Sequence, residues 1–317
     1  MDESCENVCV RGRRTLRVKM TTTQPSNRLG VRRTLAREAR VEGVTLFTGA
    51  PSAVMICPVN PGVVAEVPGI FFDCAKDGVR ARIPALHTHI HPESRRTVLV
   101  DPKTGASVQT VEHILSALVG LGITDATVRL DGPEIPVGDG SAQPFTEAML
   151  AAGGAVEIDG AKGAVGAPLR ITRRLEIVDP RDPTVRIVAE PLGAGDRDAL
   201  RVRYELDYAA ARTGIDLRQA FEFEVAAGSD GAAYLREVAP ARTFCTFAEA
   251  EAMRQAGMFK HLTPRDMLVL GPGAKPIENS LRFEDEPARH KVLDMIGDLA
   301  LAGGGVRGIV GRVTATK

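Results

Sequence analysis

One segment, residues 282–303, constrains the fold more than any other; it reads RFEDEPARHKVLDMIGDLALAG. His290, Asp294 and Asp298 recur every four residues, so on a helix they share one stripe. A second stripe at helical spacing is apolar and predicts a face that packs on a core; its members are Val292, Leu293, Ile296, Leu299 and Ala300. The segment therefore predicts a helix whose His/Asp stripe is separate from its apolar face.

The ends of this predicted helix are also marked in the sequence. Pro287 suits the first helical turn, and Asp285 and Glu286 lie where the positive end of the helix dipole favours carboxylates. Three glycines at 303–305 end the run. Because His and Asp four residues apart can give two ligands to a divalent metal, the pattern raises the question of a third ligand elsewhere.

Composition sets the broad class of protein. A chain of 317 residues with 44% hydrophobic residues predicts a globular protein of about two domains. Lys plus Arg equals Asp plus Glu at 40 each, so no basic excess would attract nucleic acid. Five cysteines without a CxxC pair favour a reducing cytoplasm, and no apolar run reaches the length of a membrane span. We expect a cytoplasmic monomer with no stable membrane insertion.

The first half of the chain predicts a small sheet with helices. Residues 1–28 are polar and aperiodic, which predicts a disordered tail, and a first domain follows over 29–158. Thr110 is the expected N-cap of a helix that ends at Gly120. Strand-like runs cover 35–41, 52–59, 69–74, 80–86 and 126–130, and a second helix is expected over 144–152.

Three histidines, His87, His89 and His91, alternate within one short run. On a strand they would point to one side and could bind a metal. A solvated edge strand explains them as well, and without a further ligand from another element we favour that interpretation.

The second half repeats the order of the first. A Gly/Ala-rich linker at 159–168 leads to a second domain, 169–317, with strands expected at 169–178, 184–190, 200–206, 220–225 and 308–316 and helices at 246–256 and 282–303. Each half carries a helix in which a charged residue precedes His, as Glu112-His113 and Arg289-His290. This order predicts a duplicated α+β unit in which two facing domains bring the two His-bearing helices together.

In that arrangement His113 is the third ligand beside His290 and Asp294. Three protein ligands leave a tetrahedral Zn²⁺ one open position for water, and Glu112 could act as general base. The alternative is ordinary, because a lone His is often a core or surface residue and a His/Asp pair is often a helix-surface contact. The pattern alone leaves both interpretations open.

Several long motifs occur in a characteristic order: TVEH at 110–113, EIPVGDGSAQPF at 134–145, ARTF at 241–244 and LRFEDEPARHKVLDMIGD at 281–298. In these motifs the chain resembles the UDP-3-O-acyl-N-acetylglucosamine deacetylases, the zinc amidases of lipid A biosynthesis. The resemblance extends from about Leu35 to the last residue. It implies two pseudo-repeated α+β domains, each a small mostly antiparallel sheet packed on two helices, with the active site between them.

The resemblance also implies roles for individual residues. It implies Zn²⁺ held by His113, His290 and Asp294, with Glu112 as general base. Two further groups follow from it: Thr243 and Asp298 as catalytic residues, and Lys291 and Phe244 as substrate-binding residues. Thr243 would donate a hydrogen bond to the oxyanion, and residues 208–223 would shape a tunnel for the acyl chain.

Three departures from the family pattern stand out. The family has a catalytic His in a Ser-Gly-His segment shortly after the strand that here ends at Lys317, so we expect a truncated chain that lacks a closing helix and leaves Asp298 without its partner. Phe47 replaces a His expected near the active site. The loop expected to read Gly-Gly-Ser is KHLTPR at 260–265.

The predicted function is zinc-dependent hydrolysis of the N-acetyl group of UDP-3-O-acyl-N-acetylglucosamine, with release of acetate. Two alternatives stay open. One is a divergent or truncated metal-binding relative with little activity, which Phe47 and the absent Ser-Gly-His favour. The other is a non-catalytic protein that binds a sugar nucleotide or a lipid, against which Glu112 argues, since binding alone needs no base.

Overall fold

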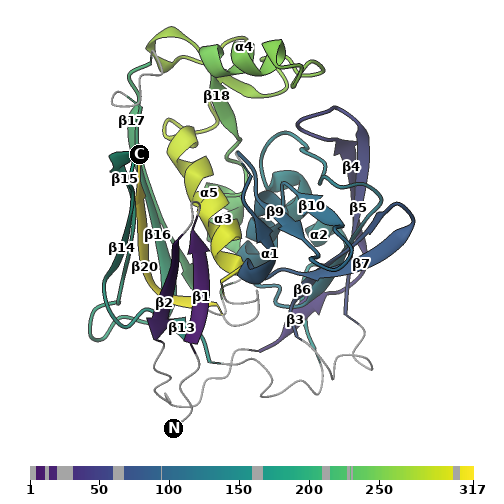
Figure 1. Ribbon diagram of the computed structural model, residues 1–317, viewed down its shortest axis with the longest axis vertical. Helices are drawn as coiled ribbons and strands as arrows, with labels where there is room; N and C mark the ends of the chain where they lie inside the picture. The colour runs from purple at the N-terminus through teal and green to yellow at the C-terminus, as the bar shows by residue number, and fades with distance from the viewer. Residues whose placement is uncertain are drawn as a thin grey trace.

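The computed structural model describes residues 5–10, 14–19, 31–59, 68–93, 95–158, 167–208, 215–226, 229, 231–302 and 308–317. Two sheets stand on either side of a pair of packed helices, α1 (Glu112–Gly120) and α5 (Glu286–Ala300) (Figure 1). Helix α5 packs against the second sheet on one side and against α1 on the other. The α+β fold predicted from the sequence is confirmed.

The first sheet has the order β4-β5-β11-β6-β7. Its central strand β11 runs antiparallel to β5 and parallel to β6, and β4–β5 and β6–β7 are antiparallel hairpins. The strands are β4 (Ala39–Val44), β5 (Pro51–Cys57), β6 (Ile70–Lys76), β7 (Val79–Pro84) and β11 (Ala126–Leu130).

The second sheet repeats these relations in the order β14-β15-β20-β16-β17. Its central strand β20 is antiparallel to β15 and parallel to β16, and β14–β15 and β16–β17 are antiparallel. In both halves the His-bearing helix directly precedes the central strand. The strands are β14 (Leu175–Asp179), β15 (Asp182–Glu190), β16 (Ala199–Asp207), β17 (Arg218–Ala226) and β20 (Ile309–Thr316), and β13 (Leu169–Arg170) also pairs with β20.

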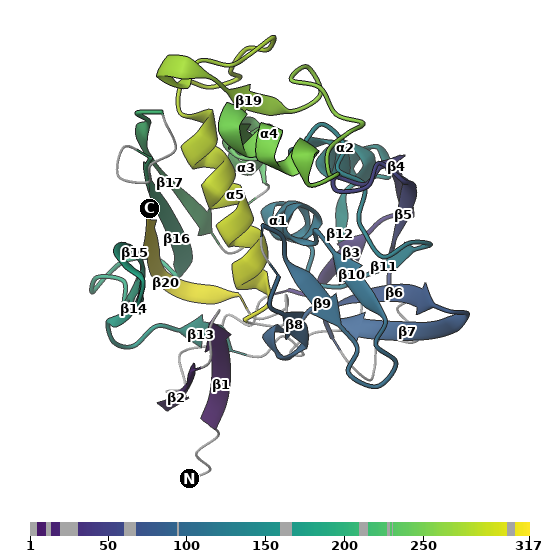
Figure 2. The same cartoon turned by 45° about the horizontal axis from the view of Figure 1, so that its top comes forward.

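Smaller elements surround this framework (Figure 2). Three short sheets join β8 (Ile90–His91), β9 (Val98–Val100) and β10 (Ser107–Gln109); β3 (Arg33–Leu35) and β12 (Ala155–Glu157); and β18 (Phe244–Thr246) and β19 (Leu268–Leu270). The other helices are α2 (Gln143–Ala151), α3 (Ala232–Glu237) and α4 (Phe247–Gln255), with short 3-10 turns at His87–His89 and Pro272–Ala274.

A glycine sets the distance between α1 and α5. A Cβ at Gly297 would lie 2.0 Å from the carbonyl oxygen of Glu112, so only glycine allows this approach. The apolar stripe predicted for α5 is confirmed, since Val292, Leu293 and Ile296 are buried. Exposure rises along the His/Asp stripe: His290 is buried where α1 covers α5, Asp294 is half-buried and Asp298 is exposed.

Several local predictions were wrong. Thr110 is not the N-cap of α1; Val111 is, and Thr110 has φ of 61°. Instead of one edge strand, His87–His89 form a 3-10 turn that is followed by β8. Within the predicted disordered tail, β1 (Cys5–Val10) and β2 (Arg14–Lys19) form an antiparallel hairpin. No strand or helix was predicted for α3, β18 or β19, which are short.

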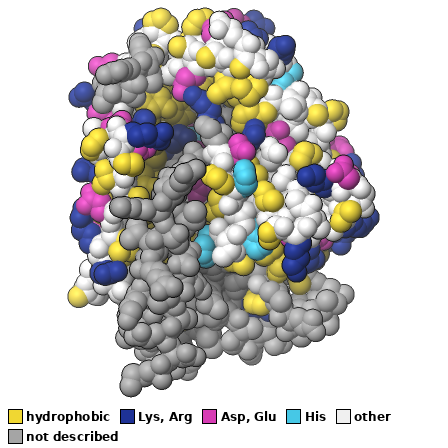
Figure 3. Space-filling model, in the orientation of Figure 1, with side chains coloured by type: hydrophobic (Ala, Val, Ile, Leu, Met, Phe, Trp, Pro, Cys, Tyr) yellow, Lys and Arg dark blue, Asp and Glu magenta, His cyan; other side chains and the backbone are white. Residues whose placement is uncertain are grey.

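Three further predictions involve segments that lie partly or wholly outside the described residues. Of the predicted tail, residues 1–4, 11–13 and 20–28 lie outside the described residues, as do 159–166 of the predicted linker and 209–214 of the predicted acyl-chain insert. The domain boundaries therefore stay a prediction. No helix in the described ranges combines the length and apolar character needed to cross a membrane. Basic and acidic side chains are interspersed on the face drawn in Figure 3, as the balanced composition indicates.

Candidate active site

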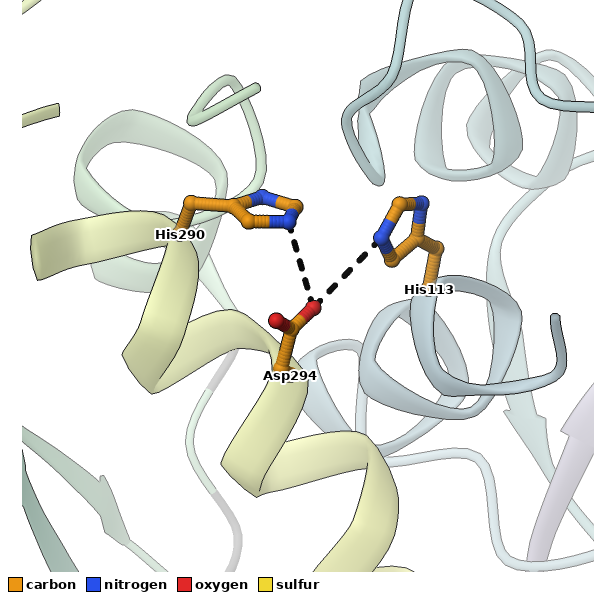
Figure 4. A group of neighbouring side chains, drawn as sticks. All are labelled: His113, His290 and Asp294. Carbon is orange, nitrogen blue, oxygen red and sulfur yellow. Dashed lines mark ion pairs between the residues drawn. The ribbon is translucent and has the colours of Figure 1, made fainter. Parts of the chain in front are cut away.

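His113, His290 and Asp294 converge where α1 meets α5 (Figure 4). His113 lies in the first turn of α1, and His290 and Asp294 lie one turn apart on α5. Asp294 Oδ1 is 3.5 Å from His113 Nε2 and 3.2 Å from His290 Nε2. One possible ligand atom from each residue lies within 4.8 Å of the others. The three residues named from the sequence are thus brought together by elements more than 170 positions apart in the chain.

The donor atoms fit a divalent cation. His113 and His290 are 4% and 1% exposed, and Asp294 Oδ1 is buried without a hydrogen-bond partner among the described residues. Such an orphaned carboxylate oxygen is costly unless a ligand satisfies it. His290 Nδ1 lies 3.0 Å from the carbonyl oxygen of Ala241, a contact that directs Nε2 towards Asp294. Two imidazoles and one carboxylate are a donor set that suits zinc.

The charges of the three groups follow from burial and contact. Burial lowers the pKa of His290 to about 4, so this imidazole is neutral, as a ligand must be. Burial also acts to lower the pKa of His113, but contact with Asp294 outweighs it and the net shift is upward. For Asp294, burial acts to raise the pKa, while contact with His290 and with the Lys291 ammonium holds it far below its usual range. Asp294 is therefore a carboxylate.

Glu112 is the first residue of α1 and is buried next to the His/Asp group. Its Oε2 accepts a hydrogen bond from the backbone N–H of Thr97 at 3.1 Å. Burial raises the pKa of this carboxyl to about 7. A carboxyl with such a pKa can both accept and release a proton near neutral pH.

Lys291 and Phe244 lie together at the edge of the site. Lys291 Nζ is 2.9 Å from Asp294 Oδ2 and 5.9 Å from the centre of the Phe244 ring. Burial acts to lower the pKa of Lys291, but Asp294 outweighs it, so the side chain is an ammonium. Tyr208 also contacts the Phe244 ring, with 5.9 Å between ring centres. This places one cation and two aromatic rings beside the His/Asp group.

Thr243 is fixed by a contact between two of the motifs. Its backbone N–H donates to the carbonyl oxygen of Gly140 at 2.7 Å. A Cβ at Gly140, which has φ of 84°, would lie 2.9 Å from Thr243 Cγ2. The glycine-containing segment 134–145 therefore supports residues 241–244.

A buried ion pair that the sequence reading missed holds the same segment. Arg242 Nε lies 2.8 Å from Glu286 Oε1, which also accepts the Arg242 backbone N–H at 3.1 Å. The sequence predicts for Glu286 only a favourable interaction with the positive end of the helix dipole. Since Arg242 lies between Ala241 and Thr243, this pair fixes both the carbonyl that orients His290 and the residue expected to face the oxyanion. The motif ARTF at 241–244, which contains Arg242, was the available signal.

The expected absence of a histidine partner for Asp298 stays a prediction, but another residue contacts its carboxylate. Thr97 Oγ1 donates to Asp298 Oδ1 at 2.6 Å. Thr97 has no distinctive sequence motif around it, so its position beside α5 emerges only from the packing of β9 against the helix pair.

Phe47 belongs to a separate apolar cluster. Its ring centre is 5.5 Å from that of Phe259, and the guanidinium of Arg96 lies 4.2 Å above it. This cluster joins the turn at 45–49 to the segment 258–269. His261, from the unusual loop, packs on Gly49, where a Cβ would lie 2.5 Å from its ring. The two departures from the family pattern thus contact the same turn.

Comparison with known proteins agrees with the motifs. The family model of the UDP-3-O-acyl N-acetylglycosamine deacetylases matches residues 32–317. The chain is 36% identical over 285 residues to the UDP-3-O-acyl-N-acetylglucosamine deacetylase of Anaeromyxobacter dehalogenans, covering 90% of this chain and 82% of that protein. It is 31% identical to the enzyme of the same name from Myxococcus xanthus, with 90% and 81% covered. A bifunctional LpxC/FabZ enzyme of Chlorobaculum tepidum is 35% identical, but the match spans 86% of this chain and only 58% of that protein.

Proposed function

The chain belongs to the UDP-3-O-acyl N-acetylglycosamine deacetylase family, and from this premise we propose that it is a zinc-dependent amidase. Its substrate is UDP-3-O-acyl-N-acetylglucosamine, named in the relatives' own descriptions. The reaction is hydrolysis of the acetamide on the sugar, which releases acetate and leaves a free amine, as a step of lipid A biosynthesis.

The convergence of His113, His290 and Asp294 is the observation that supports this proposal most strongly. These residues would hold the zinc, and the unpartnered Asp294 Oδ1 faces both imidazoles. When bound, zinc supplies positive charge that polarises a carbonyl and makes a water molecule more acidic. The rest of the chemistry falls to the surrounding side chains.

Glu112 is the base in this proposal. It is not one of the three ligands, and it is held beside His113 by the Thr97 N–H. It takes the proton from the water that attacks the acetamide carbonyl and passes it to the leaving amine. Asp298, on the next turn of α5, is the second carboxylate of the catalytic group.

Thr243, Lys291 and Phe244 face the substrate in this proposal. The Thr243 hydroxyl donates to the oxyanion that forms at the carbonyl, an interaction that strengthens as charge develops. Lys291 is an ammonium and meets the polar groups of the sugar, while Phe244 contacts its apolar side. Lys291 is also anchored to Asp294, so substrate contact and the metal ligands are coupled.

The test is to measure bound zinc and released acetate with the full chain. The zinc-loaded wild type should release acetate from the UDP-sugar. We expect His290→Ala to lose zinc and activity together, whereas Glu112→Ala keeps one zinc and loses about 100-fold to 10,000-fold in kcat. Thr184→Val, at an exposed position near the start of β15, is the matched control and should behave as wild type.

Three outcomes would count against the proposal. Stoichiometric zinc in a His113/His290 double variant would exclude the metal site. Zinc binding without acetate release by the wild type would favour the divergent relative of low activity. Tight binding of the sugar nucleotide with neither zinc nor turnover would favour the non-catalytic alternative.

A further inference from the structure

We propose that Thr97 is a positioning residue of the active site, which holds the carboxylates of Glu112 and Asp298 through two different donors. Its backbone N–H holds one carboxylate and its hydroxyl holds the other. The proposal rests on the proposed function, because it takes Glu112 and Asp298 as members of the catalytic group.

The main chain of Thr97 both accepts and donates hydrogen bonds at the start of α1. Its carbonyl oxygen accepts the N–H groups of Thr110 at 2.9 Å and Val111 at 3.5 Å. Its own N–H donates to Glu112 Oε2 at 3.1 Å. The N–H groups at a helix start have no partner within the helix, so this residue satisfies the backbone and orients the first side chain together.

The turn into α1 depends on these contacts. Thr110 has φ of 61°, a conformation that a β-branched residue rarely adopts. Such strain persists only where the surroundings hold the backbone. The bond from the Thr110 N–H to Thr97 is one of those restraints, so Thr97 determines where α1 begins and therefore where Glu112 is placed.

The hydroxyl of Thr97 reaches the second helix. Oγ1 lies 2.6 Å from Asp298 Oδ1, a short hydrogen bond from a hydroxyl to a carboxyl oxygen. Asp298 lies one turn after Asp294 on α5, and Glu112 lies next to His113 on α1. Thr97, which belongs to neither helix, therefore connects the carboxylate of one helix to that of the other.

This geometry has a consequence for catalysis. A general base acts only when its carboxylate is oriented towards the proton that it takes, and small errors in orientation are costly. The two donors can be separated by substitution. Thr97→Val removes the hydroxyl and keeps the shape and the N–H, whereas Thr97→Ser keeps both donors.

The kinetic experiment uses the zinc-loaded full chain with the UDP-sugar substrate. We expect Thr97→Val to lower kcat about fivefold with little change in KM, and Thr97→Ser to restore the wild-type kcat. Zinc content should be the same in all variants. In the control, Thr184→Val removes a hydroxyl-to-carboxylate bond of the same 2.6 Å length, to Asp182, and should leave kcat unchanged. An unchanged kcat in Thr97→Val, or an equal loss in Thr97→Ser, would overturn the role of the hydroxyl.

A second experiment does not depend on turnover. Amide hydrogen exchange of Thr97, followed by NMR in the zinc-loaded chain, should become about tenfold faster in Glu112→Ala, because the N–H loses a charged acceptor. The Thr104 N–H, bonded to Asp101 Oδ2 at 3.1 Å, should exchange as before. Unchanged exchange at Thr97 would refute the backbone contact. If the wild type releases no acetate, the proposed function fails, and this measurement still decides whether Thr97 holds Glu112.

Discussion

The two halves of the molecule share one strand pairing scheme but bury their sheets differently. Val54 of β5 pairs with Leu130 of the central strand, and Ile187 of β15 pairs with Ala315 at the equivalent place. Val54 is 1% exposed and Ile187 is 43% exposed. Helix α2 packs against β4 of the first sheet, while α5 contacts β16 and β17 of the second. Equivalent topology therefore does not give equivalent burial.

The two His-bearing helices also differ, in the residue that precedes the His. Each brings one imidazole to the centre, but the residue before the His differs in role. Glu112 points to the site and is held by Thr97, whereas Arg289 lies 4.2 Å above the ring of Phe221 and pairs with Asp285 at 2.5 Å. The repeated order of helix and central strand places one imidazole on each helix, and only in the first half is the preceding residue a carboxylic acid.

The largest expected effect tests this difference between the helices. Glu112→Gln should lower kcat about 100-fold to 10,000-fold and keep zinc, since the base is lost and the ligands remain. Arg289→Gln should leave kcat near wild type and lower the free energy of unfolding by about 1 kcal/mol, through the lost cation–π and ion-pair contacts. Acetate release measures kcat, and urea unfolding measures the free energy of unfolding. An equal loss of kcat in both variants would contradict the asymmetry.

The next effect concerns the contact between the halves. Gly297→Ala places a methyl 2.0 Å from the Glu112 carbonyl oxygen and should lower the free energy of unfolding by about 3 kcal/mol, although alanine favours helix. The helices must separate, so zinc affinity should fall too. Gly132→Ala, where the new Cβ meets open space, is the control and should change stability by less than about 0.5 kcal/mol. Thermal unfolding and zinc titration give both readouts.

A smaller effect compares the two sheets at equivalent positions. Val54→Ala opens a cavity in a buried face and should cost about 2 kcal/mol. Ile187→Ala removes more atoms from a more exposed site and should cost less than about 1 kcal/mol. Urea unfolding of both variants measures the two losses in the free energy of unfolding. A larger loss at Ile187 would mean that the second sheet is covered in solution by a part of the molecule that the structure does not describe.

The smallest effect tests the polar contact between α1 and α3. Ser116 Oγ and the Tyr234 hydroxyl are 2.9 Å apart and buried. Tyr234→Phe should cost about 1 kcal/mol, because the Ser116 hydroxyl then lacks its partner. The double variant with Ser116→Ala should recover part of that loss, as both polar groups are gone. Additive losses in the double-variant cycle would show that the contact contributes nothing.

Much of the site could be predicted from the sequence. The four-residue spacing in the α5 segment identified His290 and Asp294, and the repeat of a charged residue before His identified His113. Helical periodicity also identified the buried face of α5, because apolar residues that recur about every 3.6 positions lie on one side of a helix. The fold class followed from the order of strands and helices in each half. Each of these inferences uses residues close together in the chain.

Only the tertiary structure decided the contacts between distant segments. Thr97 as the partner of both Glu112 and Asp298, Arg242 as the partner of Glu286, and the burial of His290 all depend on contacts between segments far apart in the chain. No local pattern encodes such contacts, since a threonine before a short strand looks the same whether it faces solvent or a carboxylate. The sequence by itself determined which side chains could do the chemistry. Packing decided which of them are held in place, because orientation depends on neighbours that lie far away along the chain.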